Sequence, residues 1–529
     1  DVDPYDNYDG GQMLGVNTSN INGLIGSGAY DIGHVFSTGG GGIASTSPCG
    51  TNKGAGVTGI VTPEFDPFDI DYVSHEIGHQ FSAGHTYYNA CFGSKVTEDY
   101  EPGSASTIMG YAGICVPNVQ ENSDAYFHAT SIARITASVN SDVCEQEILI
   151  ANNEPTAVAV ASYTIPFSTP FELDGSSSTD PDGDTLTYCW EQFDSTNGGT
   201  QPPVSTNTAG PNFRTNFPTT NPIRTMPNLE AVINNTTPTW EVLSSVARTM
   251  NFRLTVRDNN PVGGQTDQAN TAITVSGTAG PFVVSSPNAA GVIWYAGALE
   301  TITWDVNGTN SLSSNVNILL STDGGYTYPI TLASGVPNNG SRTITVPDNV
   351  GTTNRIRIEA ASNIFFDLSN NDFEIKPGTW EFTTAAATQN ICQPDNAVFN
   401  FNYVPAVGYS ESVSFSVNNP AGTSVNFSPS SRSSAGPVTM TISNTSAVTP
   451  GSYPLTVTGT SSPSSDVETA AFVLNVFDNT IEDVVLSSPV NGATNQSTGI
   501  DLGWNFLASA SSYDVQVSTA ADFSSLTES

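Results

Sequence analysis

The amino-acid sequence predicts a multidomain protein, with one mixed α/β (α+β) domain followed by a series of all-β sandwiches. Three observations support this prediction. The chain has 529 residues, more than one hydrophobic core usually serves. Clear helical periodicity of apolar residues is confined to residues 1–148. Beyond residue 150, short runs of alternating apolar and polar residues are separated by clusters of Gly, Pro, Asn and Asp, which is typical of strands joined by turns.

Two helices are predicted in the first part of the chain. The first covers residues 69–82, because four apolar residues recur there at helical spacing. These residues are Ile70, Val73, Ile77 and Phe81. The second runs from about residue 124 to residue 139 and has three apolar residues on its inward face. They are Phe127, Ile132 and Ile135.

The remainder of the chain is predicted to form strands. Five segments show period-two alternation, and they are residues 252–257, 343–347, 355–359, 413–417 and 454–458. Their spacing indicates serial β-sandwiches of immunoglobulin-like type. A weak internal repeat agrees: V-V-S-S-P-N precedes Trp304, and V-L-S-S-P-V-N precedes Trp504 at a similar interval. We therefore expect a domain at residues 1–148 and modules at 150–277, 280–376, 377–479 and 483–529. The last is too short to close a sandwich, so we expect the sequence to stop inside a domain.

The composition restricts the partners of the protein. Thirteen Lys and Arg residues stand against 50 Asp and Glu residues, which gives a net charge of −37. Nucleic acid is excluded as a partner because nothing neutralises its phosphates, whereas cationic partners are favoured. Only 12% of residues are charged, and no apolar run is long enough to cross a membrane. The composition is typical of an extracellular all-β protein. The first residues are no signal peptide, so any targeting segment is expected to have been removed or to lie outside the given sequence.

Six cysteines are present, and four of them lie in the first 144 residues. This distribution fits two disulfides within one secreted domain. Cys189 and Cys392 stand in separate segments, and we expect both to be buried as small apolar side chains.

Residues 75–85 read H-E-I-G-H-Q-F-S-A-G-H and hold three of the five histidines. His75 and His79 are one helical turn apart, so both imidazoles can reach one metal ion. Zinc takes three protein ligands and keeps a fourth position open for water. His85 supplies the third ligand only if the helix ends and the chain folds back. Glu76 is not needed as a ligand, and its carboxylate can accept a proton from water activated by zinc.

An isolated H-E-x-x-H arises by chance in many sequences, and core histidines are more often packed than ligating. A third histidine at the right offset, in a chain that has only five, favours the metal site.

This segment resembles the metzincin metallopeptidases, specifically their reprolysin (adamalysin)-like branch in secreted bacterial proteins. The resemblance implies His75, His79 and His85 as zinc ligands and Glu76 as general base. T-I-M-G-Y at residues 107–111 resembles the family's Met-containing turn, which implies that Met109 lies beneath the metal. Tyr111 corresponds to a tyrosine that ligates zinc or stabilises the oxyanion in some metzincins. The predicted fold is thus a metzincin catalytic domain followed by immunoglobulin-like sandwiches.

Further features of the family have counterparts here. The resemblance implies the disulfides Cys49–Cys144 and Cys91–Cys115. Residues 39–46 resemble the edge strand along which the family binds its substrate as an added strand. The other two histidines, His34 and His128, match no family role and are interpreted as structural.

The chain departs from the family pattern in two ways. Ser82 stands where the family has a glycine at the end of the helix, and Gly84 follows two residues later. We expect the helix to stop at residues 82–84, with one of them in the left-handed region, so that His85 faces the metal. The first domain also resembles only the later part of a catalytic domain, without its first strands and first helix.

The β modules offer one candidate ion site. S-S-S-T-D-P-D-G-D-T-L-T-Y resembles the turn of PKD-like and cadherin-like sandwiches, and Asp180, Asp182 and Asp184 in it are candidates for Ca²⁺. A solvated acidic turn is the favoured interpretation, because a full set of oxygen ligands is not visible. Residues 483–529 resemble the opening of a fibronectin type III-like domain. Three tryptophans are expected in sandwich cores rather than as sugar-stacking platforms, and they are Trp190, Trp304 and Trp504.

The sequence therefore predicts a secreted zinc-dependent endopeptidase that cleaves protein or peptide substrates. The β modules are expected to serve as spacers or to hold the enzyme on a cell surface or an extracellular polymer. The alternative is a bacterial surface adhesin or structural protein of tandem immunoglobulin-like domains, with a vestigial or minor protease domain. Bound zinc and proteolysis distinguish the two.

Overall fold

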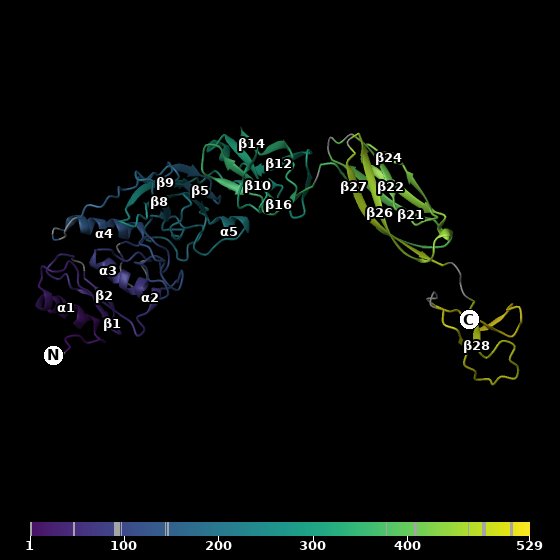
Figure 1. Ribbon diagram of the computed structural model, residues 1–529, viewed down its shortest axis with the longest axis horizontal. Coiled ribbons are helices and arrows are strands. Elements are labelled where there is room, and N and C mark those ends of the chain that lie inside the picture. Colours follow the sequence, from purple (N-terminus) through teal and green to yellow (C-terminus); the bar gives the residue numbers. More distant parts are fainter. Residues whose placement is uncertain are drawn as a thin grey trace. The chain divides into compact units, whose positions relative to one another are not determined.

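The structure is a computed structural model, and it describes residues 3–45, 48–88, 96, 98–142, 144, 148–376, 378–406, 409, 411–463, 465–478, 483–507 and 512–528. The chain divides into two compact units, Asp1–Pro377 and Gly378–Ser529, each of which is described by itself (Figure 1). A mixed α/β region followed by all-β sheets confirms the predicted fold class. None of the helices in the described segments is long and apolar enough to span a membrane.

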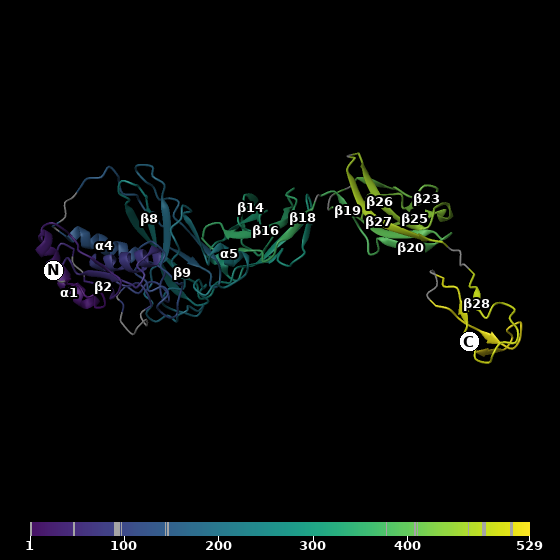
Figure 2. The same cartoon turned by 60° about the horizontal axis from the view of Figure 1, so that its bottom comes forward.

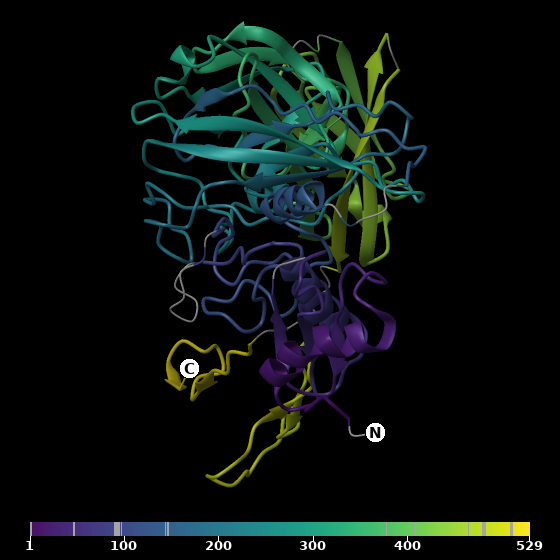
Figure 3. The ribbon, with the colours of Figure 1, turned by 90° about the vertical axis from the view of Figure 1, so that its left-hand side faces the viewer.

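The N-terminal part contains a small sheet and several helices. The sheet has the strand order β1-β3-β2, with β1 parallel and β2 antiparallel to β3. Its strands are β1 (Val35–Ser37), β2 (Gly41–Ala44) and β3 (Gly56–Gly59). The helices are α1 (Gly10–Ile25), α2 (Phe65–Phe68), the π-helix η1 (Asp69–Ser74), α3 (His75–Gln80) and α4 (Ala129–Ser141). The elements from α1 to α3, drawn in purple, gather into one group in Figure 3.

Helix α1 is an element that the sequence did not predict. Its sequence is rich in glycine and asparagine, which have weak helix propensity, so no helical pattern is visible. The helix forms because Asp9 caps it by accepting from the N–H of Gln12, and because Met13 is fully buried. The side chain of Asn17 also donates to the carbonyl of Gly54 at 2.6 Å. Tertiary contacts thus override local propensity.

The two predicted helices are present with shifted boundaries. Helical structure begins at Phe65, ends at Gln80, and passes through the π-helix on the way. The second helix begins at Ala129, because the side chain of His128 caps it by accepting from the N–H of Thr130.

Strands within residues 163–275 form the first β-sandwich, whose sheets have the orders β4-β9-β8-β6 and β5-β7. The strands are β4 (Tyr163–Ile165), β5 (Phe171–Asp174), β6 (Thr187–Gln192), β7 (Ile223–Met226), β8 (Arg248–Arg257) and β9 (Thr266–Val275), with a short helix α5 (Leu229–Ile233). Alternate residues of β8 are buried, which confirms the period-two prediction there. Trp190 is buried in this core as expected.

This sandwich packs directly against the N-terminal part, and Figure 2 shows α4 near β8 and β9. The N–H of Ala129 donates to the buried carboxylate of Glu191 at 3.0 Å. The hydroxyl groups of Tyr126 and Thr215 lie 2.9 Å apart, and the hydroxyl of Thr196 donates to Asp99 at 2.6 Å. Buried hydrogen bonds of this kind join the two parts into one folded unit.

Residues 283–376 add two more sheets, with the orders β10-β12-β15 and β11-β18-β16-β13-β14, where β17 pairs with β16. Their strands are β10 (Val283–Ser286), β11 (Ile293–Tyr295), β12 (Leu299–Asp305), β13 (Asn315–Ser321), β14 (Ile330–Pro337), β15 (Ser341–Thr345), β16 (Gly351–Ala360), β17 (Phe366–Leu368) and β18 (Phe373–Lys376). Trp304 lies in this core as expected.

The second unit contains a sandwich with the sheet orders β19-β21-β25-β23 and β20-β27-β26-β22-β24. Its strands are β19 (Trp380–Thr383), β20 (Thr388–Cys392), β21 (Ala397–Pro405), β22 (Ser412–Val417), β23 (Ser424–Ser428), β24 (Ser431–Arg432), β25 (Gly436–Ser443), β26 (Gly451–Ser462) and β27 (Val467–Phe477). Two ribbons follow, made by β28 (Leu486–Ser488) with β29 (Gly503–Trp504) and by β30 (Val517–Ser518) with β31 (Leu526–Glu528). Trp504 is half-buried there, against the ring of Tyr513.

Candidate metal centre

Three histidine rings meet at one point in the N-terminal part. The Nε2 atom of His85 lies 3.0 Å from that of His79 and 3.2 Å from that of His75. Nitrogens bound to one tetrahedral zinc ion at 2.0–2.1 Å stand roughly 3.3 Å apart, so this spacing fits a zinc ion. His75 and His79 lie on successive turns of α3, as predicted from their spacing.

Backbone carbonyl groups fix the orientation of two of these rings. Nδ1 of His75 lies 2.7 Å from the carbonyl oxygen of Ile108, and Nδ1 of His79 lies 2.7 Å from that of Ala83. A carbonyl oxygen only accepts, so both Nδ1 atoms carry the proton and both Nε2 atoms present a lone pair. Burial, the largest cause, lowers the pKa of all three imidazoles, that of His85 to about 3. Neutral imidazoles with converging lone pairs are suited to a cation.

The chain reverses between the second and third histidines as expected. Helix α3 ends at Gln80, and Ser82 has a φ of 72°, in the left-handed region. The N–H of Ala83 then donates to the carbonyl of Gly78 at 3.0 Å, which closes the turn. Ser82 therefore adopts the conformation for which glycine is usually selected, and His85 returns to the other two rings.

Met109 lies directly against α3 at Gly78, the residue before His79. It is fully buried, and a Cβ atom on Gly78 would stand 2.5 Å from its sulfur. The preceding residue, Ile108, is the one whose carbonyl accepts from His75. The turn around Met109 thus supports the helix and orients one imidazole.

Glu76 is buried beside the three histidines and is not one of the converging groups. Its Oε2 atom has no hydrogen-bond partner among the described residues, and burial raises its pKa to about 8. A Cβ atom on Gly42 in β2 would stand 2.2 Å from its Oε1 atom, so the absence of a side chain there lets the strand lie against the carboxyl group. A carboxyl group with a pKa this close to neutrality can take up and return a proton.

Tyr111 stands at the edge of the same site. Its ring centroid lies 4.6 Å from that of His85 and 5.6 Å from that of His75, and it stacks on the ring of Tyr87 at 4.4 Å. Burial, followed by the charges of Tyr87 and Glu76, raises the pKa of Tyr111, so its hydroxyl keeps its proton and remains a donor. The hydroxyl of Tyr87 lies 3.4 Å from Nδ1 of His85.

A buried carboxylate that the sequence did not single out holds the third histidine and the Met109 turn together. Glu101 is 1% exposed and accepts from the hydroxyl of Thr86 at 2.6 Å, from the hydroxyl of Thr107, and from the N–H of Ser106 at 3.1 Å. Thr86 directly follows His85, and its N–H donates to the carbonyl of Met109 at 3.1 Å. No local pattern could identify Glu101, since its partners are brought together only by folding.

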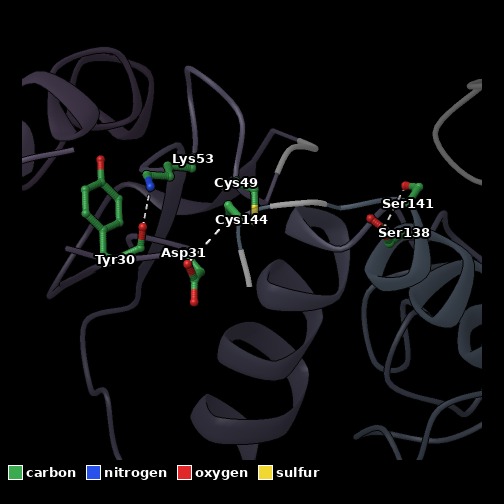
Figure 4. The surroundings of a disulfide bond; sticks show 7 residues. All are labelled: Tyr30, Asp31, Cys49, Lys53, Ser138, Ser141 and Cys144. Atoms are coloured by element: carbon green, nitrogen blue, oxygen red, sulfur yellow. Dashed lines mark hydrogen bonds between the residues drawn. A yellow bond between two sulfur atoms is a disulfide. The ribbon is translucent and has the colours of Figure 1, made fainter. Parts of the chain in front are cut away.

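Cys49 and Cys144 form a disulfide whose Cα atoms lie 5.5 Å apart (Figure 4). The bond joins the loop after β2 to the chain beyond α4, next to Asp31. Cys115 is also disulfide-bonded, whereas Cys91 of the expected Cys91–Cys115 pair lies outside the described residues. Cys189 is free and buried as expected. The same expectation for Cys392 is wrong, because this thiol is exposed near the end of strand β20.

The structure also places His34 and the three aspartates that the sequence suggested for Ca²⁺. His34 is held between Gln80 at 2.8 Å and Thr58 at 2.6 Å, which agrees with a structural role. Among the three aspartates considered for Ca²⁺, Asp180 and Asp184 approach one another together with Asp258, within 4.8 Å. Asp182 does not belong to this group, because its carboxylate accepts from the backbone and side chain of Asn153.

Comparison with known proteins relates the site to one family. Residues 1–86, which include Glu76 and all three histidines, match the family model described as metallo-peptidase family M12B, reprolysin-like. A comparison with curated proteins finds no match. The N-terminal part is therefore similar to reprolysin-like metallopeptidases.

Three solved structures illustrate what a comparison of folds finds for this chain. A nucleoside hydrolase-related hypothetical protein from Saccharophagus degradans is 20% identical, over 28% of this chain and 30% of its own, with a TM-score of 0.16. Fibronectin(III)-like modules of Clostridium thermocellum CbhA are 15% identical, over 38% and 97% of the two chains, with a TM-score of 0.14. Drosophila N-cadherin EC1-3 is 13% identical, over 60% and 98%, with a TM-score of 0.19. These values lie below the level from which a shared fold follows.

Proposed function

We propose that this protein is a zinc-dependent endopeptidase, in which His75, His79 and His85 hold the metal and Glu76 transfers protons. The observation that carries the proposal is the convergence of three Nε2 atoms beside the buried carboxyl group of Glu76, whose Oε2 atom has no hydrogen-bond partner among the described residues. The match of residues 1–86 to the reprolysin-like family model supports it independently.

Two residues of the chain have separate roles in the proposed hydrolysis of the peptide bond. Zinc, when bound, supplies Lewis acidity, which lowers the pKa of a bound water toward neutrality. Glu76 accepts a proton from the attacking water and returns it to the leaving amine. The hydroxyl of Tyr111 is a donor at the edge of the site and can stabilise negative charge on the substrate oxygen. Burial around Glu76 strengthens each of these interactions.

Strand β2 offers a place for the substrate backbone. It is the last strand of its sheet, its glycines are exposed, and Gly42 lies against Glu76. A peptide added to this edge pairs its main chain with β2 and passes close to the carboxyl group. We place the enzyme outside the cell, since Cys49 and Cys144 form a disulfide and the composition is that of an extracellular protein. The β modules would then act as spacers or as anchors to a surface.

Proteolysis of casein by the full chain tests the proposal. We expect cleavage that stops when a chelator removes the metal, returns when zinc is restored, and is absent in Glu76→Ala. A chain that neither binds zinc nor cleaves casein, and that does not differ from Glu76→Ala, would support instead a surface adhesin or structural protein with a vestigial protease domain.

A further inference from the structure

A cavity of about 490 Å³ opens beside the proposed catalytic groups. His75, Glu76 and Gly42 line it, so it is continuous with the edge strand β2 and with the place where a peptide bond would be cut. Its other walls come from the helical segment before His75 and from the chain after Tyr111. A substrate residue that flanks the cleaved bond can therefore direct its side chain into this cavity.

The walls of the cavity combine apolar surface with negative charge. Ile60, Pro67 and Ile114 supply apolar surface, while Asp71 and Glu121 add carboxylates. No Lys or Arg lines it among the residues that the structure describes. Apolar walls suit the methylene stem of a long side chain, and the carboxylates suit a cationic end.

Of the two carboxylates in the cavity wall, Asp71 is the one better placed to bind a cation. It lies in η1, one helical turn before His75, and it is half-buried. Oδ1 accepts from the N–H of Ser123 at 2.7 Å, which fixes the group at the cavity wall. Burial raises the pKa of Asp71, because it destabilises the ionised carboxylate. A cation bound in the cavity would stabilise this ionised form. Glu121 is exposed at the rim and adds charge of the same sign.

We propose that this cavity is the specificity pocket of the enzyme and selects lysine or arginine at a position that flanks the cleaved bond, with Asp71 as the residue that recognises the cation. The assignment rests on the proposed peptidase function. A net charge of −37 on the chain also favours the approach of basic substrates.

Two measurements on the full-length chain test this proposal. In the first, the chain is depleted of metal, so that no turnover occurs, and calorimetry compares two acetylated peptides that differ only in a central lysine or norleucine. These side chains share the same stem length, so the comparison isolates the charge. In the second, the zinc-loaded chain digests denatured casein, and mass spectrometry identifies the residues that flank each cleaved bond.

We expect the lysine peptide to bind about tenfold more tightly than the norleucine peptide, as a partly buried ion pair would give. Asp71→Asn should abolish this difference, because asparagine keeps the acceptor for Ser123 and loses only the charge. Asp69→Asn is the matched control: Asp69 lies in the same helical segment and is exposed outside the cavity, so the preference should persist. The casein digest should show lysine and arginine enriched at one flanking position, and the enrichment should disappear in Asp71→Asn.

The outcomes separate this inference from the proposed function. Equal binding of both peptides, or no binding of either, overturns the assignment of the pocket. Cleavage of casein without enrichment of lysine or arginine also overturns it, while the peptidase function stands. Preferential lysine binding that depends on Asp71, together with a zinc-loaded chain that cleaves nothing, supports the pocket and overturns the peptidase.

Discussion

Ser82 provides a sharp test of how the third histidine reaches the metal. Its φ of 72° places the backbone of this residue in the left-handed region. That conformation costs a residue other than glycine about 1–2 kcal/mol, because Cβ comes too close to the following carbonyl oxygen. Its hydroxyl also bonds to that of Ser138 at 3.3 Å, so a single substitution changes two interactions at once. Ser82→Gly and Ser82→Ala both lose the hydroxyl. The two variants therefore differ only in the free energy of the left-handed backbone conformation at this position. After allowance for the greater freedom of glycine in the unfolded chain, Ser82→Gly should be more stable than Ser82→Ala by about 1 kcal/mol.

Hydrogen exchange measures this difference where it acts. Residues 1–148 contain no tryptophan, so fluorescence would report on the β-sandwiches instead. Amide exchange of the peptide that covers residues 75–86 reports the local opening free energy, and 1 kcal/mol corresponds to an exchange rate about fivefold slower in Ser82→Gly than in Ser82→Ala. Equal rates, or slower exchange in Ser82→Ala, would refute the argument that left-handed strain is concentrated at this residue.

Three further predictions concern the support of the site. Burial lowers the pKa of His128 below its ordinary value of 6.5, so the folded state prefers the neutral ring, and protonation at low pH favours unfolding. The melting temperature of the wild type should therefore fall relative to that of His128→Asn between about pH 7.5 and about pH 5, while asparagine keeps the helix cap; an unchanged difference would contradict this. Glu101→Gln replaces one acceptor oxygen by a donor amide among Thr86, Ser106 and Thr107, and should destabilise the first unit by about 2 kcal/mol and accelerate zinc loss to a chelator. Wild-type melting and metal release in this variant would show that the network is dispensable. Finally, a chain that ends at residue 377 should keep the casein activity of the full chain, whereas one that ends at residue 148 should lose it, because Ala129, Tyr126 and Asp99 bond to the first sandwich. Full activity of the shorter chain would show that the sandwich is only an appendage.

The sequence was informative where the structure depends on local spacing. The four-residue separation of His75 and His79 predicts two rings on one face of a helix, and Ser82 indicates where that helix must end. The alternation in β8 likewise predicts a strand with one buried face.

Features that depend on distant contacts could not be predicted in this way. Helix α1 forms from a poor helical sequence, because Met13 and Asn17 are buried against the sheet. Glu101 gains its role from partners that only the fold brings together. Glu191 lies in a strand of the first β-sandwich and accepts from the N–H of Ala129, which is 62 residues away along the chain. Asp258 joins Asp180 and Asp184 from another strand end, and this cannot be inferred from the acidic turn alone.

Zinc coordination in the wild type and in Glu76→Gln tests the central claim most directly. We predict one zinc ion per full-length chain, with X-ray absorption showing three imidazole nitrogens at about 2.0–2.1 Å in both proteins. Casein cleavage should fall at least about 100-fold in Glu76→Gln, because the carboxylate that moves the proton is lost while the metal stays in place. A chain without zinc, a zinc site that changes its ligands in Glu76→Gln, or a variant that cleaves as fast as the wild type would contradict the account.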